Sequence, residues 1–351
     1  MQSLQEFANG LSFGEEVRFE NLTMVPVMTG AAPAEPGYLL LSEAVEAKLA
    51  RVTELGGGVV PELLFENLAD CPVLILGGEE LAGAKQNRMV NLTILAAPRS
   101  KIVIPVSCVE AGRWHTVTRE FSPSPFMAFS TMRGRSVLRV TASMRMAQCR
   151  RADQGEVWSA IAERSEELGA RSSTGAMRAI FEQRLSDIEE FVRAMAWQEG
   201  QIGAAFLIDG APAGLDVFDH PRTMEKWMAK LVRGYAVDAL AQQRSRRARE
   251  AAGEPAQTSP ENGIGAKDEL RRWLETAGTG EMLVEPAVGM GQDVRLENDK
   301  LTAAALWAEE RFVHFCAFPQ NGGLQWRGRR APNRLNRDIW RRRPRRSRGD
   351  A

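Results

Sequence analysis

The chain has 351 residues, with 45 basic and 45 acidic side chains, and 44% of its residues are hydrophobic. This hydrophobic share excludes a disordered chain, and the length allows one large domain or two smaller ones with an ample core. The net charge of zero divides unevenly: residues 321–351 hold 11 Arg and 2 acids, a net charge of +9, which leaves −9 on residues 1–320.

The sequence shows no pattern typical of disulfide scaffolds, zinc sites or membrane spans. Its four Cys are too few for a disulfide framework, and none forms a Cys-x-x-Cys pair. Residues 1–16 lack the basic and apolar regions of a signal peptide, and no run approaches the ~20 apolar residues that span a bilayer. We therefore expect a soluble, cytoplasmic protein with reduced cysteines.

Residues 1–150 are predicted to be rich in β-strands, because short apolar runs alternate with Gly, Pro, Asn and Ser. The expected strands are Leu22–Met28, Val73–Leu76, Met89–Leu95, Ile102–Val109 and Val137–Ala142. A helix is expected at Ser42–Leu55, since its apolar residues share one face and three glycines follow it.

Residues 153–250 are predicted to be mainly helical. Three helices are expected, each beginning after a residue that can cap a helix N-terminus: Asp153, Thr174 and Thr223. Before the third helix, Gln201–Ile208 and Leu215–Phe218 are expected to form a β-hairpin around Asp209-Gly210.

The remaining chain is predicted to be a linker at 252–266, an α/β segment at 267–319 and a tail. The α/β segment should hold a helix and three strands: Lys267–Thr276, Glu281–Pro286, Leu301–Glu309 and Phe312–Ala317. No periodic apolar pattern remains at 321–351, which predicts a disordered, arginine-rich tail. The fold class is therefore α+β, with a β-rich N-terminal half, a helical middle and returning C-terminal strands.

The densest polar chemistry lies between Gly77 and Trp114, around the strands expected at Met89–Leu95 and Ile102–Val109. Arg88 extends the apolar face of the first strand, and Cys108 and Glu110 extend that of the second. A three-residue loop places Arg88 opposite Cys108, whereas a five-residue loop places it opposite Glu110. Both registers gather these three side chains, and Arg88 and Glu110 are expected to pair with each other or with a ligand.

Two interpretations of this cluster remain open: a buried structural ion pair that anchors a turn, and the polar floor of a binding or catalytic pocket. The second is favoured by the number of polar side chains close to the flexible Gly77-Gly78 backbone. They are Glu79, Glu80, Lys85, Gln86, Asn87 and Arg88 before the first strand, and Ser107, Cys108, Glu110 and Arg113 at the end of the second.

These residues resemble a known family, the ADP-ribosylglycohydrolase-and-rhodanese-phosphatase-associated protein domain. The resemblance rests on Gly78–Leu81, Gly83–Arg88, Ile104–Glu110 and Gly112–Trp114. It implies a single family domain over residues 1–320 of a prokaryotic protein, with the arginine-rich tail as an addition. It also implies a link to ADP-ribose or NAD metabolism, and it assigns no reaction and no cofactor.

Two functions follow as hypotheses. The first is an enzyme, with a hydrolytic reaction as one option, that acts on ADP-ribose or a related phosphorylated nucleotide; Glu79, Glu80 and Glu110 would supply acid–base catalysis. The second is a non-catalytic binding or accessory module that uses the same pocket. In either case the ligand would be held by one set of side chains: Lys85, Gln86, Asn87, Arg88, Arg113 and Trp114.

Three further features of the sequence bear on its chemistry. Cys108 is a candidate nucleophile, although free Cys is most often a small buried hydrophobe. His314 is interpreted as a core histidine, and Asp216 and Asp293 as turn residues, so no metal site is expected. The tail is interpreted either as a solvated segment or as one that contacts a polyanion through its arginines.

Overall fold

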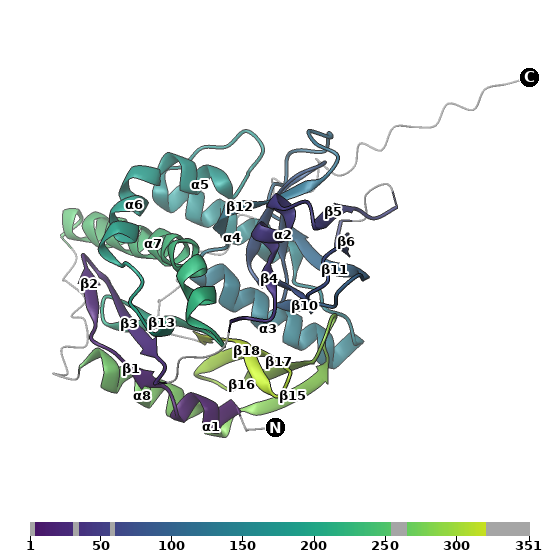
Figure 1. Ribbon diagram of the computed structural model, residues 1–351. Coiled ribbons are helices and arrows are strands. Elements are labelled where there is room, and N and C mark those ends of the chain that lie inside the picture. Colours follow the sequence, from purple (N-terminus) through teal and green to yellow (C-terminus); the bar gives the residue numbers. More distant parts are fainter. Residues whose placement is uncertain (1–3, 31–34, 57–59, 254–264, 321–351) are drawn as a thin grey trace, which may run out of the picture.

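The computed structural model describes residues 4–30, 35–56, 60–253 and 265–320, which form the α+β fold predicted from the sequence (Figure 1). The predicted tail and most of the predicted linker lie outside these residues. Strands dominate both ends of the described chain and helices its middle. None of the helices in these ranges is long and apolar enough to cross a membrane.

The N-terminal half contains two short helices and twelve strands in the described residues. Its elements are α1 (Leu4–Asn9), β1 (Ser12–Phe13), β2 (Val17–Phe19), β3 (Leu22–Met28), β4 (Leu39–Leu40), α2 (Leu41–Glu46), β5 (Ala50–Glu54), β6 (Glu62–Asn67), β7 (Val73–Ile75), β8 (Glu79–Gly83), β9 (Arg88–Val90), β10 (Ile94–Ala96), β11 (Lys101–Cys108) and β12 (Phe121–Met127). The helix expected at Ser42–Leu55 is only half right, because its second half is strand β5, paired with β6.

The expected strand at Met89–Leu95 is split into two strands that belong to different sheets. β9 pairs with β8 and β11, whereas β10 pairs with β7. The chain therefore leaves one sheet and enters another at residues 91–93. These residues become a non-strand junction between the sheets, which apolar periodicity alone could not predict.

The strand expected at Val137–Ala142 is wrong, because these residues lie within helix α3 (Ser130–Ala147). Met132, Ser136, Val140 and Met144 are all buried, and their spacing of four residues is that of one helix face. Polar residues interrupt this stripe. A prediction based on short apolar runs therefore does not detect its helical period.

The helical middle is confirmed, with some of its caps displaced. Its elements are α4 (Gln154–Leu168), α5 (Arg178–Gln183), α6 (Leu185–Ala194), β13 (Gln201–Ile208), β14 (Ala211–Phe218) and α7 (Pro221–Ala251). Asp153 caps α4 as predicted, accepting bonds from two backbone N–H groups. The cap assigned to Thr174 is wrong, since its hydroxyl donates to Glu110, and the cap of α7 is His220 instead of Thr223.

The C-terminal part of the described chain contains the predicted helix and one strand more than predicted. It comprises α8 (Ala266–Glu275), the 3-10 turn η1 (Thr276–Thr279), β15 (Glu281–Pro286), β16 (Gln292–Glu297), β17 (Leu301–Ala308) and β18 (Arg311–Pro319). β16 was missed because it carries Asp293 and Arg295, which are charged but buried as a pair between β15 and β17.

The strands form one large and two small sheets. The nine-stranded sheet has the order β1-β3-β13-β14-β18-β17-β16-β15, with β2 also paired to β3. The small sheets have the orders β10-β7-β4 and β12-β8-β9-β11-β6-β5. The large sheet thus joins N-terminal strands to strands from the middle and the C-terminal part of the chain.

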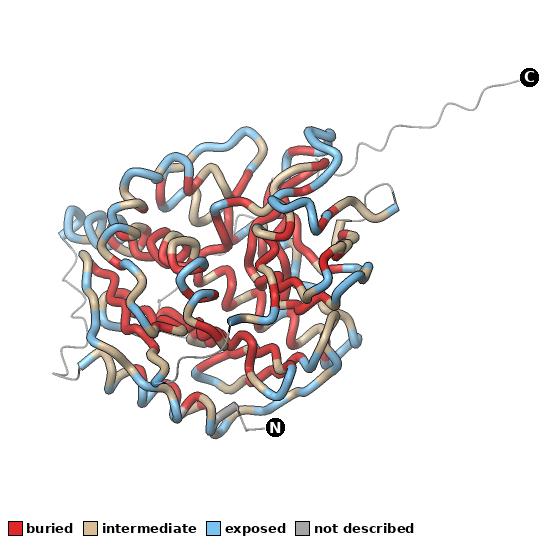
Figure 2. Tube along the Cα trace, viewed as in Figure 1, coloured by how far each residue is buried: buried red, intermediate tan, exposed pale blue. Residues whose placement is uncertain are grey.

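Helices cover both faces of the large sheet (Figure 1). Leu270 and Trp273 of α8 pack on one face with Val25 and Leu215, while α3 and α7 lie on the other. Figure 2 shows buried backbone running through the strands and through α7, with the exposed segments at the periphery. The space between α3, the large sheet and the small sheets is therefore interior, and the polar groups found there need partners.

Candidate functional site

The Gly77-Gly78 turn connects β7 to β8 and approaches two other segments closely. Gly78 has a φ of +92°, and a Cβ at this position would lie 3.1 Å from the side chain of Arg133. A Cβ at Gly77 would lie 3.1 Å from the backbone of Leu92. Because glycine has no Cβ, the turn can pack closely against α3 and against the junction at 91–93.

On one side of the turn, β9 and β11 bring the predicted residues together. Arg88 lies opposite Cys108, which is the register expected for the three-residue loop. The expected pair between Arg88 and Glu110 does not form: Arg88 donates to Gln86 Oε1 at 2.8 Å, and Glu110 pairs with Arg113 at 2.7 Å. The reason is that Glu110 leaves β11 and bridges to Ala176, so it no longer continues the ladder with β9.

Glu110 is the centre of what we call the Glu110 cluster, formed with Glu80, Asn87, Arg113 and Thr174. Its carboxylate accepts bonds from Arg113 Nε at 2.8 Å, from the Asn87 N–H at 3.2 Å and from Thr174 Oγ1 at 2.9 Å. Burial opposes its ionisation, but these donors outweigh burial and lower the pKa of Glu110. Arg113 also donates to Asn87 Oδ1 at 2.9 Å, so the cluster is bonded internally.

The two preceding carboxylates, Glu79 and Glu80, are also buried and bonded. Glu79 accepts a bond of 2.7 Å from Lys230 of α7, and Glu80 accepts one of 2.6 Å from Ser124. Burial raises the pKa of each carboxyl, because the charged form loses its hydration. Both side chains tie β8 to neighbouring elements.

Cys108 is buried behind this cluster. Its Sγ lies 3.3 Å from the carbonyl oxygen of Glu110, and its backbone exchanges two bonds of 2.8 Å with the Gln154 side chain. Burial raises the pKa of the Cys108 thiol, and the Glu110 N–H, which donates to Sγ at 3.5 Å, and Arg88 offset this only in part. These contacts favour the neutral thiol over the reactive thiolate.

Lys85 and Trp114, predicted as ligand contacts, lie at the rim of the Glu110 cluster. The Lys85 ammonium sits 5.3 Å from the centre of the Trp114 ring, a cation–π contact. Trp114 is 52% exposed. The structure therefore gathers Gln86, Asn87, Arg88 and Arg113 inside the protein and leaves this pair near its surface.

On the other side of the turn lies a pocket, here called the turn pocket. It has about 340 Å³ of empty volume including its mouth. Three groups of residues line it: Gly77, Gly78, Asn91, Leu92 and Thr93 from the turn and the junction; Arg133, Ser136 and Val137 from α3; and Arg295, Ala304, Cys316 and Phe318 from β16, β17 and β18.

A second buried cluster, here called the Asp216 cluster, reaches the turn pocket through Arg133. Its members are Asp216, Arg133, Tyr235 and His314. Asp216 on β14 is fully buried and accepts bonds from both terminal nitrogens of Arg133, from Tyr235 at 3.1 Å and from His314 Nε2 at 3.2 Å. Burial opposes ionisation of Asp216, but Arg133 outweighs it and holds its pKa well below the usual range. On the far side of the ring, His314 Nδ1 lies 2.9 Å from Thr93 Oγ1.

The sequence reasoning missed this cluster. The interpretation of Asp216 and Asp293 as turn residues is wrong, since both lie inside strands and pair with Arg133 and Arg295. The available signal was a carboxylate within an apolar strand, where an unpaired charge is very costly. His314 is a satisfied core histidine, as interpreted, and burial lowers its pKa.

Asp216, His314 and Cys316 have ligand atoms within 4.8 Å of one another, the spacing of a metal site. Arg133 holds both oxygens of Asp216, however, so a metal ion would have to displace a guanidinium cation. Burial also raises the pKa of the Cys316 thiol to about 12, which opposes formation of the thiolate that binds metal. The donor set therefore does not fit a metal ion.

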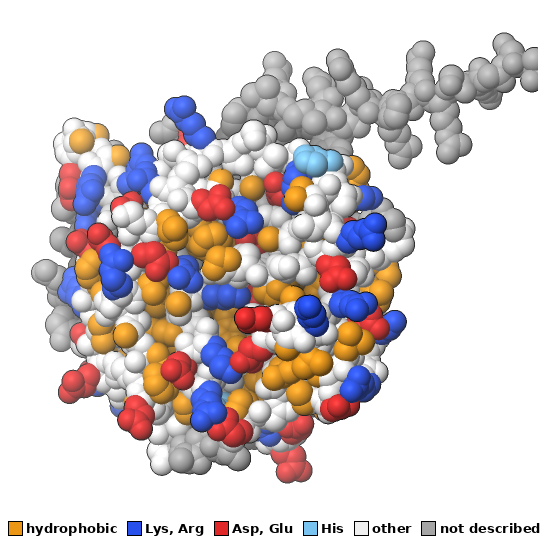
Figure 3. Space-filling model, turned by 45° about the horizontal axis from the view of Figure 1, so that its top comes forward, with side chains coloured by type: hydrophobic (Ala, Val, Ile, Leu, Met, Phe, Trp, Pro, Cys, Tyr) orange, Lys and Arg blue, Asp and Glu red, His pale blue; other side chains and the backbone are white. Residues whose placement is uncertain are grey.

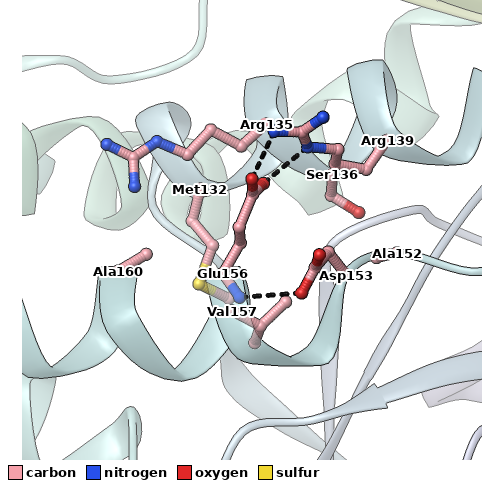
Figure 4. A pocket seen from close by; sticks show the side chains of 9 residues that line it. All are labelled: Met132, Arg135, Ser136, Arg139, Ala152, Asp153, Glu156, Val157 and Ala160. Carbon is pink, nitrogen blue, oxygen red and sulfur yellow. Dashed lines mark hydrogen bonds and ion pairs between the residues drawn. The ribbon is translucent and has the colours of Figure 1, made fainter. Parts of the chain in front are cut away.

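A second, shallower pocket lies between α3 and α4 (Figure 4). Its charged residues satisfy one another: Arg139 Nε donates to Glu156 at 2.7 Å, and Asp153 accepts from the backbone at the start of α4. These exposed pairs add little binding capacity, so the turn pocket is the better candidate site.

Fold and site together define an α+β protein with a small pocket at a glycine turn, flanked by two buried charged clusters. The chain belongs to the ARG and Rhodanese-Phosphatase-superfamily-associated Protein domain family, whose sequence model matches residues 10–318. This family is associated with ADP-ribose-related systems. No curated protein and no solved structure matches the chain.

Proposed function

We propose that this protein binds a phosphorylated nucleotide of the ADP-ribose class, with a phosphate group seated in the turn pocket. The family's association with ADP-ribose-related systems supports the ligand class. The empty volume of about 340 Å³ includes open solvent at the mouth, so the enclosed part would hold a small group and not a whole nucleotide. The pocket would hold one end of the nucleotide, with the remainder toward its mouth.

The observation that carries the proposal is the state of Arg295. This side chain is 1% exposed, and its Nε and Nη2 bond to Asp293 at 2.6 and 2.9 Å. Its Nη1 has no hydrogen-bond partner among the described residues, and neither has Ser136 Oγ on the opposite wall. A buried donor without an acceptor costs about 1–3 kcal/mol, and a phosphate oxygen is a strong acceptor for guanidinium.

Local hydrogen-bond donors, and not the net charge of the protein, would hold this anion. Residues 1–320 carry a net charge of −9, and Figure 3 shows basic and acidic side chains interspersed over one face of the molecule. The turn pocket is lined by two buried guanidinium groups, Arg133 and Arg295, each paired with an aspartate, so their N–H groups would act as hydrogen-bond donors to the anion.

The Glu110 cluster would then support the turn from behind instead of contacting the ligand. Glu110 and Glu80 of this cluster each accept a hydrogen bond, as does the neighbouring Glu79. This observation favours, as a second candidate function, a binding module in which none of the three glutamates predicted as catalytic performs chemistry. Gln86, Asn87, Arg88 and Arg113 would be positioning residues in both cases.

The proposal is tested by thermal shift with ADP-ribose, NAD and inorganic phosphate. A ligand that binds only the folded state must raise the melting temperature, by mass action. We expect ADP-ribose to stabilise the wild type and to lose this effect in the double variant Asp293→Asn/Arg295→Gln. Changing both partners avoids leaving a buried carboxylate without its cation.

The matched control is Arg139→Gln, which removes an arginine from the shallower pocket of Figure 4. It should keep the full ADP-ribose shift. Absence of a shift in the wild type with all three compounds, or an undiminished shift in the Asp293/Arg295 double variant, would contradict the proposal.

A further inference from the structure

We propose that Thr93, His314 and Asp216 form a hydroxyl–imidazole–carboxylate relay that makes the turn pocket a hydrolytic site for phosphate esters or anhydrides. Thr93 Oγ1 is the nucleophile, His314 the base, and Asp216 the residue that positions the imidazole. The inference rests on the proposed function, because it assigns a reaction to the same pocket.

The geometry links the three groups in line. Thr93 Oγ1 lies 2.9 Å from His314 Nδ1, and His314 Nε2 lies 3.2 Å from Asp216 Oδ1. These separations are within hydrogen-bond reach, as nucleophile, base and orienting group require. Thr93 is the member that lines the turn pocket, and it is only half-buried, whereas the other two are enclosed.

The fold explains why residues so distant in sequence meet. β14 and β18 pair so that Phe218 faces His314 and Asp216 faces Cys316, which puts Asp216 and His314 on one face of the large sheet. Thr93 belongs to the junction between β9 and β10, where the chain crosses between the small sheets. The break between β9 and β10 therefore places the Thr93 hydroxyl next to the His314 imidazole.

The hydrogen bonds define where each proton lies. Asp216 accepts two bonds from Arg133 and one from Tyr235, so it is an ionised acceptor and His314 Nε2 must carry the proton. Neutral His314 then presents a bare Nδ1, to which the Thr93 hydroxyl donates. Thr93 Oγ1 in turn accepts the Gly77 N–H at 3.2 Å, which fixes the direction of its donated proton.

The reaction balances without an added oxidant, reductant or cofactor. Thr93 Oγ1 bonds to phosphorus as its proton passes to His314 Nδ1; the bond to the leaving oxygen breaks, and that oxygen takes the proton. A water molecule then gives a proton to Nδ1 and its oxygen attacks phosphorus. The bond from phosphorus to Oγ1 breaks, and Oγ1 recovers the proton. Arg295 Nη1 and Ser136 Oγ supply donors for the phosphoryl oxygens.

Cys316 is the competing nucleophile in the same pocket. Burial raises its pKa to about 12, so it remains a neutral thiol near pH 7. The hydroxyl of Thr93, by contrast, already contacts an unprotonated imidazole nitrogen. The relay therefore favours oxygen over sulfur as the attacking atom.

The test uses diisopropyl fluorophosphate, a small probe for activated hydroxyl groups, on the full chain at pH 7.5. Thr93 Oγ1 bonds to phosphorus, the phosphorus–fluorine bond breaks, and the hydroxyl proton leaves with fluoride by way of His314. Peptide mass spectrometry locates and times the adduct. In parallel, release of p-nitrophenol from p-nitrophenyl phosphate measures turnover.

We expect an adduct on Thr93 in the wild type, none at residue 93 in Thr93→Val, and retention in Thr93→Ser, which keeps the hydroxyl. His314→Gln should slow labelling and turnover by roughly 10²–10⁴-fold, the usual contribution of general acid–base catalysis. Thr53→Val removes a half-buried threonine hydroxyl from β5, outside the pocket, and should match the wild type.

An unlabelled Thr93 in the wild type, or equal labelling rates in the wild type and His314→Gln, would overturn the relay. Binding is measured separately by the ADP-ribose thermal shift of the wild type. A shift without labelling leaves the proposed function standing and removes the relay. Labelling without a shift supports the relay and removes the nucleotide proposal.

Discussion

Three buried charged pairs flank the Gly77-Gly78 turn and the turn pocket. Glu110 pairs with Arg113, Asp216 with Arg133, and Asp293 with Arg295, and all six side chains are nearly buried. Removing one partner from such a pair leaves an uncompensated buried charge, which costs much more than the pair contributes. Substitution of a residue that only supports the site should therefore lower stability, whereas substitution of a residue that contacts the ligand should lower binding.

Arg113→Ala is expected to destabilise the protein by roughly 3–5 kcal/mol, because it leaves Glu110 buried without its cation. Urea denaturation measures the change in the free energy of unfolding. The control is Arg99→Ala, which breaks a pair with Asp70 whose side chains are 62% and 85% exposed; it should cost less than about 1 kcal/mol. If Arg113→Ala were as mild as the control and instead abolished the ADP-ribose shift, Arg113 would be a ligand contact.

At the scale of elements, two short connections between strands supply five of the residues that line the turn pocket. The Gly77-Gly78 turn and the junction at 91–93 lie where the small sheets meet α3 and the large sheet, and both line the turn pocket. Regular elements were predictable where the apolar period was clear: β3, β13 and β15 have the predicted bounds. Prediction failed at α3 and β16, whose buried polar residues interrupt the period.

Gly78→Ala is expected to destabilise the fold by about 1–3 kcal/mol, the usual cost of holding a residue other than glycine in a sparsely populated backbone region. The new Cβ would also press on Arg133, 3.1 Å away, and weaken the ADP-ribose shift. Thermal and urea denaturation measure the first effect.

Gly37→Ala is the matched control, because a Cβ at Gly37 meets nothing within 4 Å and its backbone lacks a positive φ. It should change stability by no more than a few tenths of a kcal/mol, in line with an ordinary surface substitution. Equal stability of the two variants would show that the turn tolerates a side chain.

At the scale of the whole molecule, the balanced charge hides an acidic body and a basic tail. The described fold closes with β18, which pairs with β14 and β17, and the family match ends at residue 318. The 11 Arg beyond residue 320 therefore lie outside the matched residues. Their contact with a polyanion remains a prediction from composition.

A chain ending at Gln320 is expected to keep the melting temperature and the ADP-ribose shift of the full chain. The full chain should bind heparin with an affinity that falls steeply as salt rises, since each neutralised anion releases counterions. The shortened chain, with a net charge of −9, should lose this binding. A lowered melting temperature after truncation would instead make the tail part of the fold.

The sequence by itself indicated the α+β class through local periodicity, the family through its resemblance, and two possible registers for Arg88 through strand parity. The tertiary structure set Arg88 opposite Cys108. Only the tertiary structure decided which charges pair. Glu110 pairs with Arg113 instead of Arg88. Thr93 and Asp216 both contact His314, although Thr93 is more than 200 residues away from it in the sequence. Partners of buried charges depend on how sheets cross in space, and no periodicity along the chain records that crossing.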